Sequence, residues 1–157
     1  MRQDTRLSRL LHVLLHMSEH DGPMTSQQIA DMLATNPVVV RRIMAGLREA
    51  GYVAAERGHG GGWTLTRTPS EITLRDVYQC LGSPDLFAFG LSNPDPQCLV
   101  ERSVNATIRE TVENATQAIL ARFGDIRLSD IEQDFQIRRE QRTAHSTGAI
   151  RGNDHGN

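Results

Sequence analysis

Apolar side chains recur at intervals of three and four residues through the first fifty positions of this chain, which predicts three short helices. The first is expected over residues 2–19, and four leucines line its core side, with Leu10 beside them: Leu7, Leu11, Leu14 and Leu15. Thr25 and Gln28 form a capping box for the second helix, and Asn36, followed by proline, caps the third. Gly51 follows the last periodic residues and suits a left-handed C-terminal cap. Two short helices joined by so tight a turn match the helix-turn-helix pattern.

The third helix has a polar face opposite its apolar one. The apolar face is formed by Val40, Ile43, Met44 and Leu47. The opposite face presents Val38, Arg41 and Arg42. Arginine can bond guanine bidentately or hold a phosphate, and a valine methyl can contact the thymine methyl. The same pattern also suits a solvated charged face in which Arg42 pairs with an acid, but the segment that follows favours DNA recognition.

Residues 52–55 and 63–65 predict two strands joined by a glycine-rich turn, which together form a wing. Glycines there allow a tight turn and close backbone approach to a ligand. Arg57, His59 and Gly60 lie at the tip, where they are expected to reach a minor groove or phosphates. A nucleotide-binding loop is the rival interpretation, but the turn lacks lysine and no helix starts directly after it.

The second half of the chain predicts a short packed helix, a loop and a long helix. Thr73 and Asp76 form a variant capping box for the short helix. The long helix, over residues 100–123, carries an apolar stripe at nearly heptad spacing: Val104, Ile108, Thr111, Val112, Ala115, Ala118 and Ile119. Such a stripe can pack against a partner helix or cover the monomer's own core. The length of the helix favours a symmetric dimer, which would present two readers to two half-sites.

These elements divide the chain into four parts. We expect a winged helix-turn-helix DNA-binding domain over residues 1–82 and a linker or sensor loop over 83–99. Residues 100–137 are expected to hold the dimerisation helix and a short final helix, and the polar residues 138–157 a disordered tail. The predicted fold class is therefore mainly α with a small β-hairpin wing.

Composition and charge indicate where the protein is located and which part of it carries positive charge. Two cysteines are too few for a disulfide scaffold, no apolar run approaches a membrane span and no secretory signal is evident, which predicts a cytoplasmic protein without a membrane partner. Net charge is −2, yet residues 1–67 carry eight arginines against six acids. The basic half coincides with the predicted reader of DNA, as a local electrostatic footprint should.

Three histidines, His12, His16 and His20, recur every four residues on the first helix. That spacing can bind a metal through two imidazoles, but no third ligand accompanies them. Exposed or pH-sensitive helix histidines are the preferred interpretation, and no metal site is predicted. The sequence shows neither paired carboxylates nor a nucleophile with a base at useful spacing, so an enzyme is not expected.

Four segments carry a more specific pattern: residues 36–42 (NPVVVRR), 58–63 (GHGGGW), 72–78 (ITLRDVY) and 96–100 (PQCLV). Together they resemble the Rrf-type winged-helix transcription regulators, the bacterial family of IscR, NsrR and CymR. The resemblance spans roughly residues 3–135. It implies a homodimeric DNA-binding repressor or dual regulator with a long dimerisation helix. It also implies DNA contacts from Ser26 and Gln27, from the recognition helix and from the wing.

The cysteines depart from the pattern of the iron–sulfur members, which carry three between the wing and the dimer helix. This chain has one there, Cys98, and Cys80 lies earlier. A cluster needs four ligands, usually thiolates, so no iron–sulfur cluster or other cofactor is expected. The resemblance is instead to the cluster-free branch, in which a lone cysteine has been proposed to sense oxidants or electrophiles. Next to the N-terminus of the long helix, the Cys98 thiol is expected to have a lowered pKa; the alternative is a small buried apolar residue.

The sequence thus predicts a homodimeric, sequence-specific DNA-binding transcription regulator. We expect a repressor that binds a palindromic operator in double-stranded DNA and responds to thiol oxidation through Cys98. Two alternatives stay open. One is a ligand- or metal-responsive regulator with a small molecule between the loop at 82–97 and the dimer helix. The other is a winged-helix protein-interaction module with no role on DNA.

Overall fold

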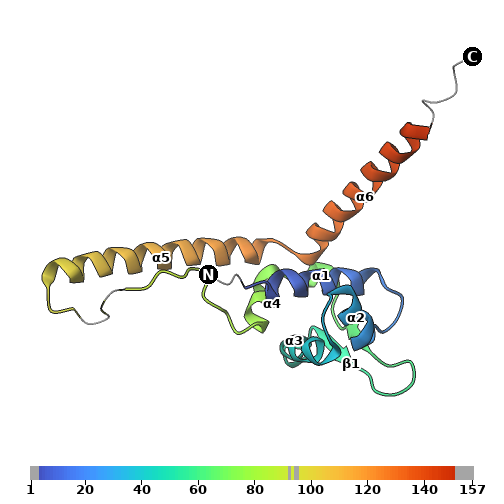
Figure 1. Cartoon of the computed structure of the whole chain (residues 1–157), viewed down its shortest axis with the longest axis horizontal. Coiled ribbons are helices and arrows are strands. Elements are labelled where there is room, and N and C mark those ends of the chain that lie inside the picture. The colour runs from blue at the N-terminus through green and yellow to red at the C-terminus, as the bar shows by residue number, and fades with distance from the viewer. Residues whose placement is uncertain (1–3, 92, 94–95, 151–157) are drawn as a thin grey trace, which may run out of the picture.

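The computed structural model describes residues 4–91, 93 and 96–150, with side chains up to Thr143. Its helices and strands are, in order, α1 (Arg6–Glu19), α2 (Ser26–Met32), α3 (Pro37–Glu49), β1 (Val53–Ala55), β2 (Trp63–Leu65), the 3-10 helix η1 (Pro69–Glu71), α4 (Leu74–Cys80), α5 (Leu99–Asp125) and α6 (Leu128–Ile150). We call α1 to α4 with the hairpin the winged domain. Figure 1 shows α5 along one side of this domain and α6 projecting away from it. The predicted fold class, mainly α with a small hairpin, is confirmed.

The core lies where α1 is covered by α3, α4, α6 and the hairpin. Its largest fully buried side chains include Leu10, Leu14, Ile29, Met44, Leu47, Ile72 and Leu128. The predicted core side of α1 was only partly right. Leu14 is buried, whereas Leu7, Leu11 and Leu15 are half-buried, and the buried face is completed by Leu10, Val13 and Met17. The face is rotated because other elements cover a flank of the helix that its leucine spacing does not mark.

The predicted caps of the helix-turn-helix are confirmed. The Thr25 hydroxyl accepts a hydrogen bond from the Gln28 N–H at 3.1 Å, and the Gln28 side chain accepts one from the Thr25 N–H at 2.8 Å. The Asn36 side chain accepts from the two N–H groups of Val38 and Val39, each at 3.0 Å, so it satisfies donors that have no partner within α3. Gly51 has φ +75° and ends α3 in the left-handed region that favours glycine.

The hairpin is fastened to the start of α2 rather than standing alone. Strands β1 and β2 pair antiparallel, and Trp63 exchanges two backbone hydrogen bonds with Met24, at 2.8 and 3.0 Å. A Cβ at Gly62 would lie 2.6 Å from the Met24 carbonyl oxygen. This glycine therefore serves close backbone approach within the protein, whereas the exposed Gly58 and Gly60 have positive φ and shape the turn.

The junction of α5 and α6 is joined to the winged domain through backbone hydrogen bonds. Leu74 N–H donates to the Ile126 carbonyl at 3.0 Å, and Leu128 N–H donates to the Ile72 carbonyl at 2.8 Å. The C-terminal end of α5 is thereby fixed beside α4. Its other end extends past the domain, as Figure 1 shows.

Helix α6 is longer than the sequence predicted. It was expected to be short and to give way to a disordered tail at residue 138, but it continues to Ile150; residues 151–157 lie outside the described part of the chain. The residues directly after Ile137, 138–142 (RREQR), are arginine, glutamate and glutamine, which favour helix even without an apolar stripe. Its first turns are attached to α1, since Glu132 accepts from Ser18 at 3.0 Å and Gln136 donates to Glu19 at 2.6 Å.

The capping box of α4 yields a pH-dependent prediction. Burial raises the pKa of Asp76, but hydrogen bonds from the Thr73 hydroxyl and N–H, at 2.7 and 2.8 Å, together with Tyr52 and Arg67, outweigh it and lower the pKa. The ionised carboxylate therefore stabilises the fold above the ordinary pKa of 3.8, and this contribution is lost as pH falls through the lower folded value. We expect Asp76→Asn to cost about 1 kcal/mol of unfolding free energy at neutral pH.

Urea unfolding of wild type and Asp76→Asn at neutral pH and below the ordinary aspartate pKa measures this effect. The difference between the two proteins should narrow in acid, because the wild-type carboxyl then becomes protonated. Asp21→Asn, which changes an exposed acid elsewhere, is the matched control and should leave stability nearly unchanged at both pH values. A wild-type advantage of equal size at both pH values would contradict the role of the charge.

Candidate nucleic-acid interface

Helix α3 divides into a buried and an exposed face. Val40, Met44 and Leu47 are buried in the core and hold the helix against α2 and the hairpin. Val38, Arg41 and Arg42 are exposed, and Val38 keeps 67% of its surface accessible. Most of the surface of this β-branched apolar residue, which lies beside two arginines, is left uncovered by the residues that the structure describes. The arrangement suits a partner that offers methyl groups and hydrogen-bond acceptors together, as a DNA major groove does.

The two arginines of α3 are available for a partner. Within the described part of the chain, the side chain of neither Arg41 nor Arg42 makes a hydrogen bond or an ion pair. The alternative in which Arg42 pairs with a nearby acid is therefore not what the structure shows. Over residues 37–62 the exposed charges are four arginines, Arg41, Arg42, Arg48 and Arg57, against Glu49 and Glu56, which leaves this region positive.

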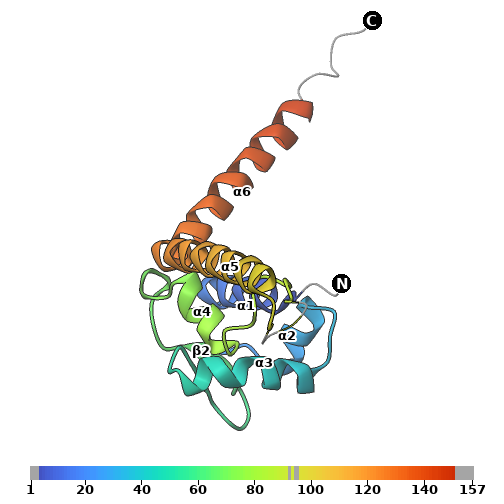
Figure 2. The ribbon, with the colours of Figure 1, turned by 90° about the vertical axis from the view of Figure 1, so that its left-hand side faces the viewer.

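The wing lies on the same side of the molecule as α3. Figures 1 and 2 both show the turn between β1 and β2 projecting beyond the winged domain on the side opposite α5. Arg57, His59 and Gly60 are exposed in this turn. We call the surface formed by Val38, Arg41, Arg42, Arg57 and His59 the DNA-reading face, because these are the residues for which the sequence predicts contact with DNA. The α3 residues and the wing residues of this face are 15 to 21 positions apart in the sequence, yet they lie on one side of the molecule.

Two residues at the start of α2 that the family resemblance implicates have intramolecular partners. The Ser26 hydroxyl accepts a hydrogen bond from the Trp63 indole N–H at 3.0 Å and is half-buried. Gln27 is exposed and donates to Asp31 at 2.7 Å. Ser26 therefore couples α2 to strand β2, a role that no local sequence signal indicated because Trp63 lies 37 residues away. Gln27 lies at the surface, so its side chain can give up the bond to Asp31 and contact a DNA phosphate instead.

Cys98 lies at the N-cap of α5 with its thiol exposed. The backbone N–H groups of Glu101 and Val100 face the sulfur and lower the pKa of the thiol, so the predicted direction is confirmed and the alternative of a buried apolar residue is wrong. Cys80 is different. It is half-buried on α4, and burial raises the pKa of its thiol, which keeps it in the less reactive protonated form.

The histidines of α1 do not assemble into a larger cluster. The Nε2 atoms of His12 and His16 are 3.0 Å apart. The pKa of His12 is lowered, mainly because the imidazole is partly buried and secondly because His16 lies beside it. His20 instead contacts the Gly22 carbonyl oxygen at 3.2 Å. Among the residues that the structure describes, no group of three or more His, Cys, Asp or Glu side chains has the geometry to hold a metal ion.

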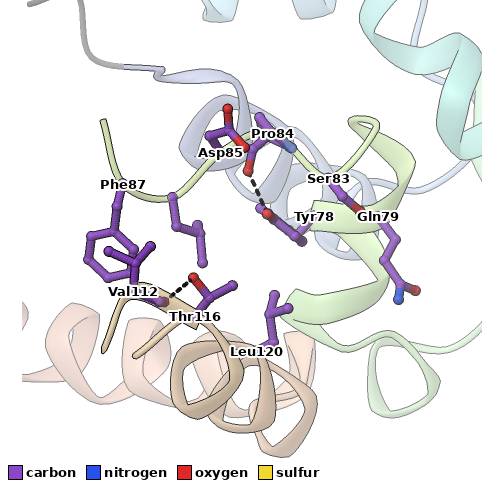
Figure 3. A pocket seen from close by; sticks show the side chains of 10 residues that line it. Tyr78, Gln79, Ser83, Pro84, Asp85, Phe87, Val112, Thr116 and Leu120 are labelled. Carbon is purple, nitrogen blue, oxygen red and sulfur yellow. Dashed lines mark hydrogen bonds between the residues drawn. The ribbon is translucent and has the colours of Figure 1, made fainter. Parts of the chain in front are cut away.

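A cavity of about 290 Å³ lies between α4, the loop that follows it and α5 (Figure 3). Leu86, Phe87 and Val112 form an apolar wall, and Gln79 and Asp85 add polar groups. The Tyr78 hydroxyl donates to the Pro84 carbonyl at 2.5 Å and so fixes the loop against α4. The cavity coincides with the place where a small molecule was envisaged between the loop and the long helix.

The helix-turn-helix, its exposed arginines and the adjacent wing define a winged helix-turn-helix protein. The Rrf2 family, described as iron-dependent transcriptional regulators, matches residues 3–134. YwnA of Bacillus subtilis strain 168, a proposed HTH-type transcriptional regulator, is 33% identical over 129 residues, which cover 82% of this chain and 95% of YwnA. The chain belongs to the Rrf2 family and is a DNA-binding transcription regulator.

Solved structures show the same fold. A proposed transcriptional regulator from Lactobacillus plantarum has a TM-score of 0.71 at 23% identity, and the match covers 88% of this chain and 98% of that one. CymR (YrzC), the global cysteine regulator of B. subtilis, has a TM-score of 0.55 at 23% identity over 85% of this chain and 97% of CymR. In the described residues, no helix is both long and apolar enough to cross a membrane.

The family description names iron, but this chain has too few cysteines to hold an iron–sulfur cluster. An iron–sulfur cluster is held by four ligands, usually thiolates, and the whole sequence has two cysteines. Cys98 is exposed at the start of α5, whereas Cys80 is half-buried at the end of α4. The residues of one chain therefore do not fit a four-thiolate cluster.

Proposed function

We propose that the protein is a homodimeric repressor that binds a palindromic operator, with its two subunits joined through residues 100–123. The observation that carries the proposal is an apolar surface on α5 that the chain leaves uncovered. Val100, Val104 and Ile108 expose 72%, 50% and 36% of their surfaces. A soluble protein rarely leaves contiguous apolar side chains in water, because covering them is favourable by roughly 25 cal/mol per Å².

The apolar stripe of α5 serves two different surfaces. Val112 turns toward the winged domain, where it lines the cavity beside α4 together with Thr116 and Leu120. Val104, Ile108 and Thr111 are exposed. At 100° per residue, the exposed set lies well over a quarter turn away from the covered set, so one helix packs on its own domain and still offers a face to a second copy.

A symmetric dimer through α5 is economical for a DNA-binding protein. It duplicates the DNA-reading face, and a two-fold axis in the protein matches a palindromic site in DNA. Titration of the full-length protein against a palindrome from its own promoter region, at several salt concentrations, tests the proposal. Strong, salt-dependent binding by a species of twice the chain mass supports it, whereas binding of random DNA with equal affinity contradicts it. A lower transcript yield in vitro on adding protein distinguishes a repressor from an activator.

Cys98 supplies the proposed redox response. Its thiol is exposed and has a lowered pKa, and it lies at the start of the helix that would join the subunits. A thiolate is the form that attacks peroxides and quinones. We expect wild type to lose operator binding after treatment with peroxide or a quinone, and Cys98→Ser to keep it, in gel-shift titrations.

Cys80→Ser is the matched control for this prediction. The Cys80 thiol has a raised pKa and is half-buried, so its removal should leave the response to oxidant intact. Loss of operator binding to the same extent in wild type and Cys98→Ser would reject the thiol switch while leaving the DNA-binding function untouched.

A second candidate response is a small ligand in the cavity of Figure 3. The observation that favours it is position, because the cavity is bounded by α4 of the winged domain and by α5. A ligand there would contact both the DNA-binding and the dimerising parts of the chain. An absorption spectrum and mass spectrum of the native protein as isolated would reveal a co-purified compound, and its absence together with an active Cys98 response would favour the thiol switch.

A further inference from the structure

A separate cavity of about 390 Å³ opens beside the recognition helix. It lies between the N-terminal end of α1, one flank of α3 and the last turn of α4. Three arginines and three aliphatic side chains characterise its lining: Arg6, Arg9, Arg42, Val39, Ile43 and Leu81. The combination of cationic and apolar groups is specific enough to indicate a class of ligand.

Only one of the three arginines that line this cavity is paired with an acid in the described residues. Arg6 is engaged by Asp4, with its Nε 3.0 Å from both carboxylate oxygens. The side chains of Arg9 and Arg42 form no hydrogen bond or ion pair with any residue that the structure describes. Two guanidinium groups therefore remain available for one anionic group, and arginine binds carboxylates well because its N–H donors form a planar fork.

The apolar side of the cavity runs along α3. Val39 and Ile43 are one turn apart on the same flank, and Leu81 faces them from the end of α4. Gly46 continues this flank, and a Cβ there would collide with the Cys80 carbonyl oxygen, so the α3 and α4 backbones are in contact. From Val39 to Gly46 the helix rises about 10 Å, which is similar to the length of an extended eight-carbon chain.

We propose that this cavity binds a small amphipathic monocarboxylate, with the carboxylate held by Arg9 and Arg42 and the aliphatic chain against Val39, Ile43 and Leu81. Arg42 also belongs to the DNA-reading face, at its border with the cavity. A bound carboxylate neutralises Arg42 and competes with DNA for it. The ligand therefore weakens operator binding, a consequence that rests on the proposed function, whereas binding of the carboxylate itself does not.

A phosphate of the DNA backbone is the other anion that a pair of arginines such as Arg9 and Arg42 can hold. A phosphate diester gains nothing from an aliphatic wall, and a cavity of this volume exceeds what one phosphate group needs. The three aliphatic residues favour a ligand with an apolar body. The two possibilities differ in what Arg9 does, which makes Arg9 the residue to change.

Calorimetric titration of the full-length protein with sodium octanoate, without DNA, tests the site. Wild type should bind octanoate, and Arg9→Gln should bind it about ten-fold more weakly, as expected for loss of a hydrogen-bonded charged group. Inorganic phosphate, which lacks the chain, should give no measurable heat. Arg75→Gln, which removes an exposed arginine of α4 outside the cavity, should bind octanoate like wild type. Thermal unfolding of each variant verifies that it is folded.

Gel shifts then separate this proposal from the proposed function. Octanoate should weaken operator binding by wild type but not by Arg9→Gln. Failure of wild type to bind octanoate, or equal binding by wild type and Arg9→Gln, overturns the proposal. If Arg9→Gln instead weakens DNA binding with a shallower salt dependence and octanoate does not bind, the two arginines hold a DNA phosphate. Octanoate binding that depends on Arg9 in a protein without operator affinity would sustain the site and overturn only its consequence for DNA.

Discussion

Ile108→Asp is expected to convert the proposed dimer into monomers and to weaken binding to a palindromic operator by about a hundred-fold or more. Ile108 lies within the exposed stripe of α5, near the middle of the helix. In a symmetric interface the substitution is made twice, so two carboxylates face an apolar surface without a partner. An unpaired buried charge costs several kcal/mol, which exceeds what the remaining contacts of one helix pair can offset. Light scattering after size-exclusion chromatography measures the mass directly.

Ala106→Asp is the matched control for this prediction. Ala106 is exposed on the same helix, but it is two residues from Ile108 and therefore points about 160° away from it. It introduces the same charge with the same helix propensity outside the stripe, and the dimer should persist. A dimer of normal operator affinity in Ile108→Asp would show that the subunits, if joined at all, meet elsewhere. Circular dichroism of both variants excludes unfolding as the cause of a change.

The parts of the fold that local chemistry controls were predictable. The Thr25 capping box, the Asn36 cap and the left-handed Gly51 follow from hydrogen bonds and backbone angles within a few residues, and all three are present. The division of α3 into a buried and an exposed face was equally predictable, because its apolar residues recur at helical spacing.

The features that were missed depend on contacts distant in sequence. Which flank of α1 is buried depends on α4, α6 and the hairpin, so leucine spacing alone placed its core face only partly correctly. The bond between Ser26 and Trp63 joins two elements that no local pattern connects. Helix α6 lacks an amphipathic stripe, so a prediction based on apolar spacing ended it too early. The cavity beside Arg9 and Arg42 exists because α1, α3 and α4 meet, which no single segment encodes.

Arg41→Ala and Arg42→Ala are each expected to weaken operator binding by about 1–3 kcal/mol, or roughly five-fold to more than a hundred-fold, where the arginine reads a base. Both side chains are exposed, and neither has a partner among the described residues that would have to be released first. Fluorescence anisotropy with the palindrome measures the affinity. Arg75→Ala, on α4 away from the DNA-reading face, is the control and should bind like wild type.

Two measurements, the binding of operator variants with single base changes and the salt dependence of binding, separate the two ways in which an arginine of α3 can act. An arginine that reads a guanine loses discrimination at one base pair when replaced, so operator variants at that position become equivalent for the mutant protein. An arginine that holds a phosphate weakens binding to every sequence and lowers the salt slope by about one. Arg42 lines the cavity between α1, α3 and α4, at the edge of the DNA-reading face, whereas Arg41 does not line it. We therefore expect Arg41 to contact a base and Arg42 to have the larger effect on the salt dependence of binding. Unchanged affinity, specificity and salt slope in both variants would remove α3 from the recognition role.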